Sequence, residues 1–222
     1  MDAKIQKAVE AGLKTYARID NLQVEPLLST IATAFDAEAS YLEKVDLLDQ
    51  AFDDAPQFEE LREVFFDLLL INFFAEDVVK LEDDYLESEE WEQIEDQTID
   101  RGTELLNIFL YLRECKDDEI TPDLEDYLKE FLLVEEDEFQ DEHEIYEDVI
   151  ANQILVDSPY AEIAKVAATI DETKDLAEYF YVIMSYFSEI NPSDAQFEEF
   201  EAASANKALD ASVYQIITNY GN

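Results

Sequence analysis

The sequence predicts an all-α protein, folded as a compact multi-helix bundle or irregular helical array of about nine to eleven helices. Apolar residues recur at helical spacing along the whole chain, and no alternating run of strand type competes with them. Only 3 of 222 residues are glycine, whereas strand-rich and phosphate-cradling folds use glycine at turns and loops. With 48% hydrophobic residues, 14 Phe and 12 Tyr, the chain can bury a core despite its charge.

The first helix is predicted over residues 2–18, where Ile5, Val9, Leu13 and Tyr16 form one apolar stripe. Similar stripes predict the later helices in chain order, over residues 25–36, 38–53, 56–76, 89–115, 122–139, 142–156, 159–170, 172–190, 194–204 and 206–219.

Three helix starts carry recognisable capping signals. Ser193 stands three residues before Gln196, which is the spacing of a capping box. Thr121 and Ser158 each precede a proline, the arrangement of an N-cap residue followed by proline at the first helical position.

The length fits one domain over residues 1–222, with a division into 1–116 and 117–222 as the alternative. The single cysteine, Cys115, has no internal disulfide partner, and the first 20 residues lack the apolar run of a signal peptide. The most apolar segment, residues 64–74, is interrupted by Asp67 and Asn72 and is far shorter than the roughly 20 residues of a membrane span. We expect a cytoplasmic protein without membrane association.

Negative charge is the most distinctive feature of the chain, with a net charge of −43. It is uneven: residues 1–35 carry no net charge, whereas residues 36–150 hold 41 acidic and 7 basic residues, a net charge of −34. That equals the charge of about 58 Å of duplex DNA, or roughly 17 base pairs. Solubility alone requires a net charge of only about 2–8 in magnitude for a small domain.

The composition resembles that of DNA-mimic proteins, so we interpret the acidic middle of the chain as a partner-binding surface. The partner would be a basic protein, either a nucleic-acid-binding protein or a nuclease toxin that this chain inhibits as an immunity protein. We expect no direct binding of nucleic acid, no cofactor and no metal, and the oligomeric state stays open. Tyr85 and Trp91 are expected as exposed aromatic anchors. The predicted binding carboxylates are Glu82, Asp83, Asp84, Glu87, Glu89, Glu90, Glu92, Glu135, Glu136, Asp137, Glu138, Asp141, Glu142 and Glu144.

An enzyme is the alternative from a different class. The run from Glu59 to Glu63 resembles the first half of the EExxE…ExxD signature of all-α nucleoside triphosphate pyrophosphohydrolases. The resemblance implies Mg²⁺ binding by Glu60, Glu63 and Glu76. The resemblance does not extend beyond Glu76, because the third residue after it is Val79, where that family has Asp. We therefore expect a protein that is not an enzyme.

A further alternative is that the charge has no partner role. Runs of acidic residues usually form a solvated face. On that interpretation the chain is an acidic helical protein whose carboxylates only contact water.

Overall fold

The computed structural model describes residues 1–76, 80, 83–132, 138–174 and 176–221, with backbone alone at 83–84, 130–132 and 138–144. Within these ranges every regular element is a helix and no strand occurs. The predicted all-α fold class is confirmed. None of the described helices is both long and apolar enough to cross a bilayer.

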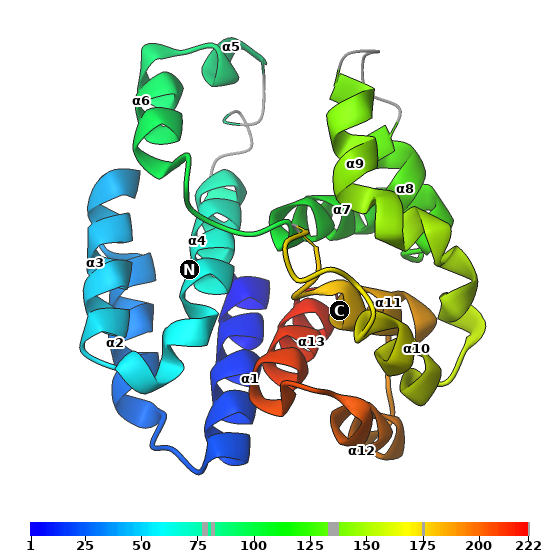
Figure 1. Cartoon of the computed structure of the whole chain (residues 1–222). Helices are drawn as coiled ribbons and strands as arrows, with labels where there is room; N and C mark the ends of the chain where they lie inside the picture. Colours follow the sequence, from blue (N-terminus) through cyan, green and yellow to red (C-terminus); the bar gives the residue numbers. More distant parts are fainter. Residues whose placement is uncertain (77–79, 81–82, 133–137, 175, 222) are drawn as a thin grey trace.

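The N-terminal helices form one side of the molecule (Figure 1). The first helix begins where the Asp2 carboxylate accepts the backbone N–H groups of Lys4 and Ile5, and the third begins at a capping box between Ser40 and Glu43. These elements are α1 (Ala3–Asp20), α2 (Glu25–Asp36), α3 (Tyr41–Asp53), the 3₁₀ helix η1 (Pro56–Leu61) and α4 (Arg62–Glu76).

Two short helices from the acidic middle of the chain, α5 (Asp83–Leu86) and α6 (Glu89–Thr98), lie above this side, and Ser88 caps α6 by accepting the Trp91 N–H. The chain then crosses to the other side of the molecule through α7 (Leu105–Asp117). The helices of that side are α8 (Leu124–Leu132), α9 (Glu138–Ala151), η3 (Gln153–Asp157), α10 (Tyr160–Ala167), α11 (Phe180–Ser188), α12 (Asp194–Ala203) and α13 (Lys207–Gly221).

Several predicted boundaries are corrected. The single helix expected over 89–115 is two helices, because the chain breaks at Gly102, whose φ of 85° is left-handed. The segment expected over 172–190 is an α-helix only from Phe180. The Ser193–Gln196 capping box is confirmed, but α8 is capped by Asp123 and α10 starts after Pro159 without a side-chain cap, so Thr121 and Ser158 are not N-caps.

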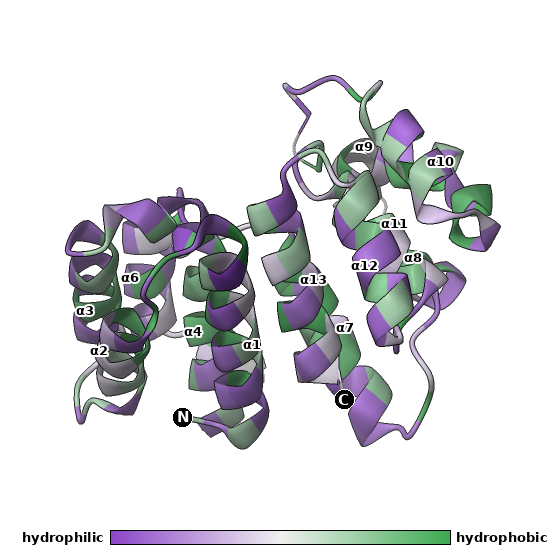
Figure 2. Cartoon of the chain, turned by 90° about the horizontal axis from the view of Figure 1, so that it is seen from below, coloured by the Kyte–Doolittle hydropathy of each residue, from purple (hydrophilic) through white to green (hydrophobic). Residues whose placement is uncertain are grey.

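The two sides meet where α1 packs along α13, which both views place side by side (Figures 1 and 2). Buried hydrophobic residues of both sides belong to one continuous cluster, which runs from Ile5 on α1 to Tyr220 on α13. Figure 2 colours the helices by hydropathy and shows hydrophobic and hydrophilic residues divided between opposite helix faces. The α1–α13 contact is therefore the centre of the structure.

Gly12 permits the close approach of α1 to α13. A Cβ atom at this position would lie 2.5 Å from Cγ1 and 2.6 Å from Cδ1 of Ile216. We expect Gly12→Ala to lower the free energy of unfolding by about 1–2 kcal/mol, since overpacking outweighs the better helix propensity of alanine.

The matched background is Ile216→Ala, which removes both clashing atoms. There Gly12→Ala should raise stability by roughly 1 kcal/mol, because only the helix propensity remains. Urea unfolding of the four proteins measures this cycle. A Gly12→Ala effect of equal sign and size in both backgrounds would contradict the packing explanation.

Asp210 is a buried carboxyl on α13, and its Oδ2 accepts the Ser204 hydroxyl at 2.6 Å. Burial raises its pKa to about 6, although the hydrogen bond from Ser204 acts in the opposite direction. Its folded pKa is thus above the unfolded value of about 3.9, so its contribution favours folding below pH 4 and is lost as pH rises towards 6.

Asp210→Asn removes this titration while keeping a side-chain acceptor for Ser204. The stability of Asp210→Asn relative to wild type should therefore increase by about 2–3 kcal/mol between pH 4 and pH 7. Urea unfolding across this range measures the difference. A constant difference between the two proteins would show that Asp210 titrates normally.

Candidate partner-binding surface

Helix α6 presents an acidic outer face. Its inner side is anchored by Ile94, which is buried, and by Trp91, which packs against Phe74 with ring centroids 5.5 Å apart. The outer side and the turn before it expose Glu87, Glu89, Glu90, Glu92, Glu95 and Asp96. Within the described part of the chain, none of these six carboxylates forms an ion pair.

The structure thus brings four of the predicted binding carboxylates together at α6 and adds Glu95 and Asp96. Glu82, Glu135, Glu136 and Asp137 lie outside the described residues. Only the backbone is described for six others, which lie on α5 and α9: Asp83, Asp84, Glu138, Asp141, Glu142 and Glu144. Figure 1 places α6 and α9 at the same end of the molecule, α6 above the N-terminal helices and α9 on the other side.

Tyr85 and Trp91, which the sequence analysis expects to be exposed, are half-buried in the structure. Tyr85 lies 6.2 Å from Trp91 and 6.3 Å from Phe73 between ring centroids, and Trp91 also contacts Phe74. Because Phe73 and Phe74 lie in the last turn of α4, both rings bury part of their apolar surface against it. They attach α5 and α6 to α4, and their role as anchors for a partner stays a prediction.

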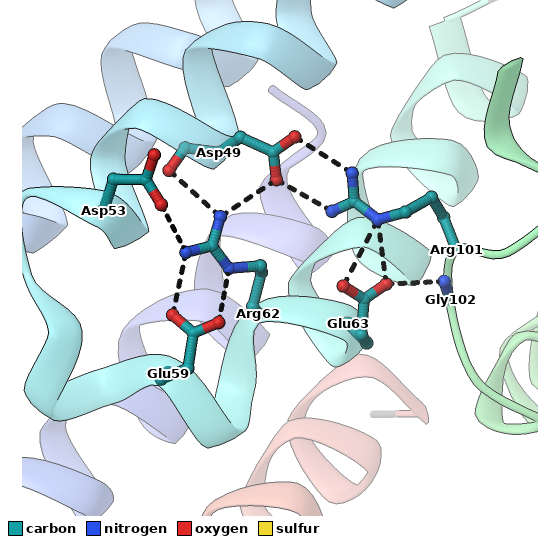
Figure 3. Close-up of polar contacts among 7 residues, drawn as sticks. All are labelled: Asp49, Asp53, Glu59, Arg62, Glu63, Arg101 and Gly102. Atoms are coloured by element: carbon teal, nitrogen blue, oxygen red, sulfur yellow. Dashed lines mark hydrogen bonds and ion pairs between the residues drawn. The ribbon is translucent and has the colours of Figure 1, made fainter.

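Arg101 fixes the chain directly after α6 (Figure 3). Its Nη1 and Nη2 donate to the two oxygens of Asp49 on α3 at 2.9 and 2.8 Å, and its Nε donates to Glu63 on α4 at 3.1 Å. The guanidinium also lies 4.8 Å from the centroid of the Phe66 ring. We call Arg101 with its two carboxylates, Asp49 and Glu63, the Arg101 clamp.

Gly102 and Thr103, which follow Arg101, form further hydrogen bonds with α4. The Gly102 N–H donates to Glu63 at 2.8 Å, and the N–H and hydroxyl of Thr103 donate to the buried carboxyl of Asp67 at 3.0 and 2.6 Å. Burial raises the pKa of Asp67 well above its ordinary value, although the Thr103 hydrogen bonds lower it in part. The chain that follows α6 is therefore joined to α4 by hydrogen bonds from its backbone as well as from its side chains.

A second arginine shares Asp49 with the clamp. Arg62 donates from Nη1 to Asp49 at 3.2 Å, from Nη2 to Asp53 at 2.7 Å, and through Nε and Nη2 to Glu59 at 2.8 Å each (Figure 3). Burial tends to raise the pKa of Asp49, but the bonds and charge of Arg101 and then Arg62 outweigh it and hold this pKa below its usual range. Two of the four arginines of the chain, Arg62 and Arg101, thus bind carboxylates of α3, η1 and α4.

The carboxylates of the pyrophosphohydrolase resemblance have separate partners. Glu60 accepts the Tyr16 hydroxyl at 2.8 Å, Glu63 belongs to the Arg101 clamp, and Glu76 lies 3.6 Å from the Lys44 ammonium. Among the residues whose side chains are described, no group of three or more His, Cys, Asp or Glu is placed to hold a metal ion. The three residues that the resemblance implies as Mg²⁺ ligands therefore do not form such a group.

An apolar cavity of about 510 Å³ adjoins α6, between this helix, α4 and the start of α7. Ile99 lines this cavity and has 79% of its surface exposed. The acidic residues Glu95 and Asp96 also line the cavity. Sequence reasoning missed this site, because its apolar members come from three separate segments: Phe66, Leu70, Trp91, Ile99 and Leu106.

Comparison of the chain with protein-family models, with curated proteins and with solved structures finds no match. Function must therefore be inferred from the charge and geometry of this surface.

Proposed function

We propose that the protein is an acidic inhibitor that occupies the basic site of a nucleic-acid-binding protein or nuclease, with α6 as its central binding element. One observation supports this most: six exposed carboxylates without an ion pair among the described residues lie on a segment that Arg101 attaches to α3 and α4. A rigidly held charge pattern loses little conformational entropy on binding.

The charge density of α6 is comparable to that of a nucleic-acid strand. Residues 81–100 contain ten acidic residues and no Lys, Arg or His. Helix α6 itself carries five carboxylates over ten residues, or about one per 3 Å of helix axis. One strand of duplex DNA carries one charge per about 3.4 Å. A groove whose Lys and Arg side chains are spaced for phosphates would meet carboxylates at similar spacing.

The apolar cavity beside α6 supports a protein as the partner. Interfaces between proteins combine a few buried apolar anchors with a polar rim. Ile99 and the cavity wall supply the apolar element, and Glu95 and Asp96 supply negative charge next to it. This arrangement fits a basic protein surface that carries an apolar side chain among its Lys and Arg residues.

Ile99→Ser tests the proposed surface, with Ile154→Ser as its matched control. Both isoleucines are 79% exposed, so neither substitution should change the free energy of unfolding by more than about 0.5 kcal/mol. Partners captured from a host lysate at about 0.1 M salt and released at about 1 M are identified, purified and titrated. Ile99→Ser should weaken the affinity roughly tenfold, a loss of about 1.4 kcal/mol, and Ile154→Ser should leave it unchanged. Equal affinities for the two variants would remove this face from the proposed interface.

A further inference from the structure

A second cavity carries positive charge in this very acidic chain. It has a volume of about 160 Å³ and lies between the first turn of α1, the last turns of α7 and the end of α13. Ile5 and Leu112 contribute apolar wall, and three cationic side chains line it: Lys4, Arg113 and Lys116. None of its lining residues belongs to α6.

None of these three cations forms an ion pair with a carboxylate whose position is described. The chain has 57 acidic and 14 basic residues, so acidic partners are in large excess. Asp2 and Asp117 also line the cavity, but the Asp2 carboxylate accepts the first N–H groups of α1. The three cations therefore lie around one cavity, and none of them has a carboxylate partner of its own among the described residues.

The donors of these cations are incompletely used. Nη1 of Arg113 is buried and has no hydrogen-bond acceptor among the described groups. Nζ of Lys4 donates to the Tyr220 carbonyl oxygen at 3.2 Å. Burial first, and the nearby charge of Lys116 second, lower the pKa of the Lys4 ammonium. An anion in the cavity would be attracted by the three cations that line it, and it would relieve the repulsion between the two ammonium groups.

We propose that this cavity binds a phosphate group, either as inorganic phosphate or as the end of a phosphomonoester. Arginine and lysine together are the side chains that proteins use for phosphate, and three of them line this cavity. Its volume is below the roughly 300–1,000 Å³ of pockets that enclose drug-sized ligands. The site therefore suits a single phosphate group and not a whole nucleotide.

Isothermal titration calorimetry with inorganic phosphate, at constant ionic strength in chloride, tests the assignment. Lys116→Gln is the main variant, because Lys116 is exposed and its loss should leave the fold intact. Lys7→Gln is the matched control: Lys7 is an exposed lysine on α1 that does not line the cavity, and its substitution changes the net charge equally. We expect Lys116→Gln to weaken phosphate binding at least tenfold and Lys7→Gln to change it less than twofold.

Glycerol phosphate and acetate distinguish the sources of the anion. Binding of glycerol phosphate with similar affinity would identify a phosphomonoester end as a ligand, and binding of inorganic phosphate alone would identify the free ion; either supports the proposal. Absence of phosphate binding to the wild-type protein, equal losses in the two lysine variants, or tighter binding of acetate would overturn it.

Discussion

Arg101→Gln should lower the free energy of unfolding by about 2–4 kcal/mol. The substitution leaves Glu63 without an ion-pair partner among the described residues and leaves Asp49 with Arg62 alone. A carboxylate that loses its partner in a partly buried site is strongly destabilising. The side chain of Arg101 is 20% exposed and those of its two partners are 32% and 38% exposed, so the loss should lie below that of a fully buried pair. Urea unfolding measures it.

Arg18→Gln is the control for this substitution. Arg18 also pairs with a carboxylate, that of Glu201, but its side chain is 54% exposed, and a surface pair of this kind contributes about 0–1 kcal/mol. Hydrogen exchange adds a local measurement: the amides of α6 should exchange faster in Arg101→Gln and at the wild-type rate in Arg18→Gln. Equal losses of stability, or an unchanged exchange rate in α6, would show that the Arg101 clamp does not hold α6 in place.

Neutralising α6 should have the largest effect on binding. A variant with Glu89→Gln, Glu90→Gln and Glu92→Gln should bind a basic partner roughly a hundredfold more weakly, at about 1 kcal/mol per lost charge. Its stability should change little, since the lost interaction with the helix N-terminus and the relieved repulsion between like charges oppose each other.

Helix α12 provides a matched control of the same charge. Asp194→Asn, Glu198→Gln and Glu199→Gln also remove three exposed acids, one of them in the first turn, at the opposite end of the molecule from α6 (Figure 1). This variant should keep the wild-type affinity within a few-fold. Equal weakening by the two triple variants would indicate that total charge, and not the α6 surface, governs association.

The sequence predicts the fold class because its local signals agree with the tertiary structure. The stripe from Ile5 to Tyr16 is buried along α1, and the Ser193 capping box forms as expected. Such signals lie within a single helix, so they can be read without knowledge of the fold.

The candidate site depends on contacts that are distant in sequence. Arg101 is 52 residues from Asp49 and 38 from Glu63. The half-burial of Tyr85 and Trp91 follows from their contacts with Phe73 and Phe74 near the end of α4. One signal was available: Asp67 and Asn72 interrupt the most apolar segment. Both are buried, and they accept hydrogen bonds from Thr103 and from the Asp2 N–H respectively. Polar residues within an apolar helix thus indicated where other segments attach.

Competition with nucleic acid tests the central claim most directly. The captured partner is bound to labelled duplex DNA or RNA, and the unlabelled protein is added at about 0.1 M salt and again near 1 M, where the Debye length falls from about 10 to about 3 Å. We predict that the wild-type protein displaces the nucleic acid at low salt, that the α6 triple variant does so far less well, and that high salt abolishes the effect. A ternary complex of partner, nucleic acid and this protein, or an affinity insensitive to salt, would contradict the proposal and identify the charge as a solvated surface.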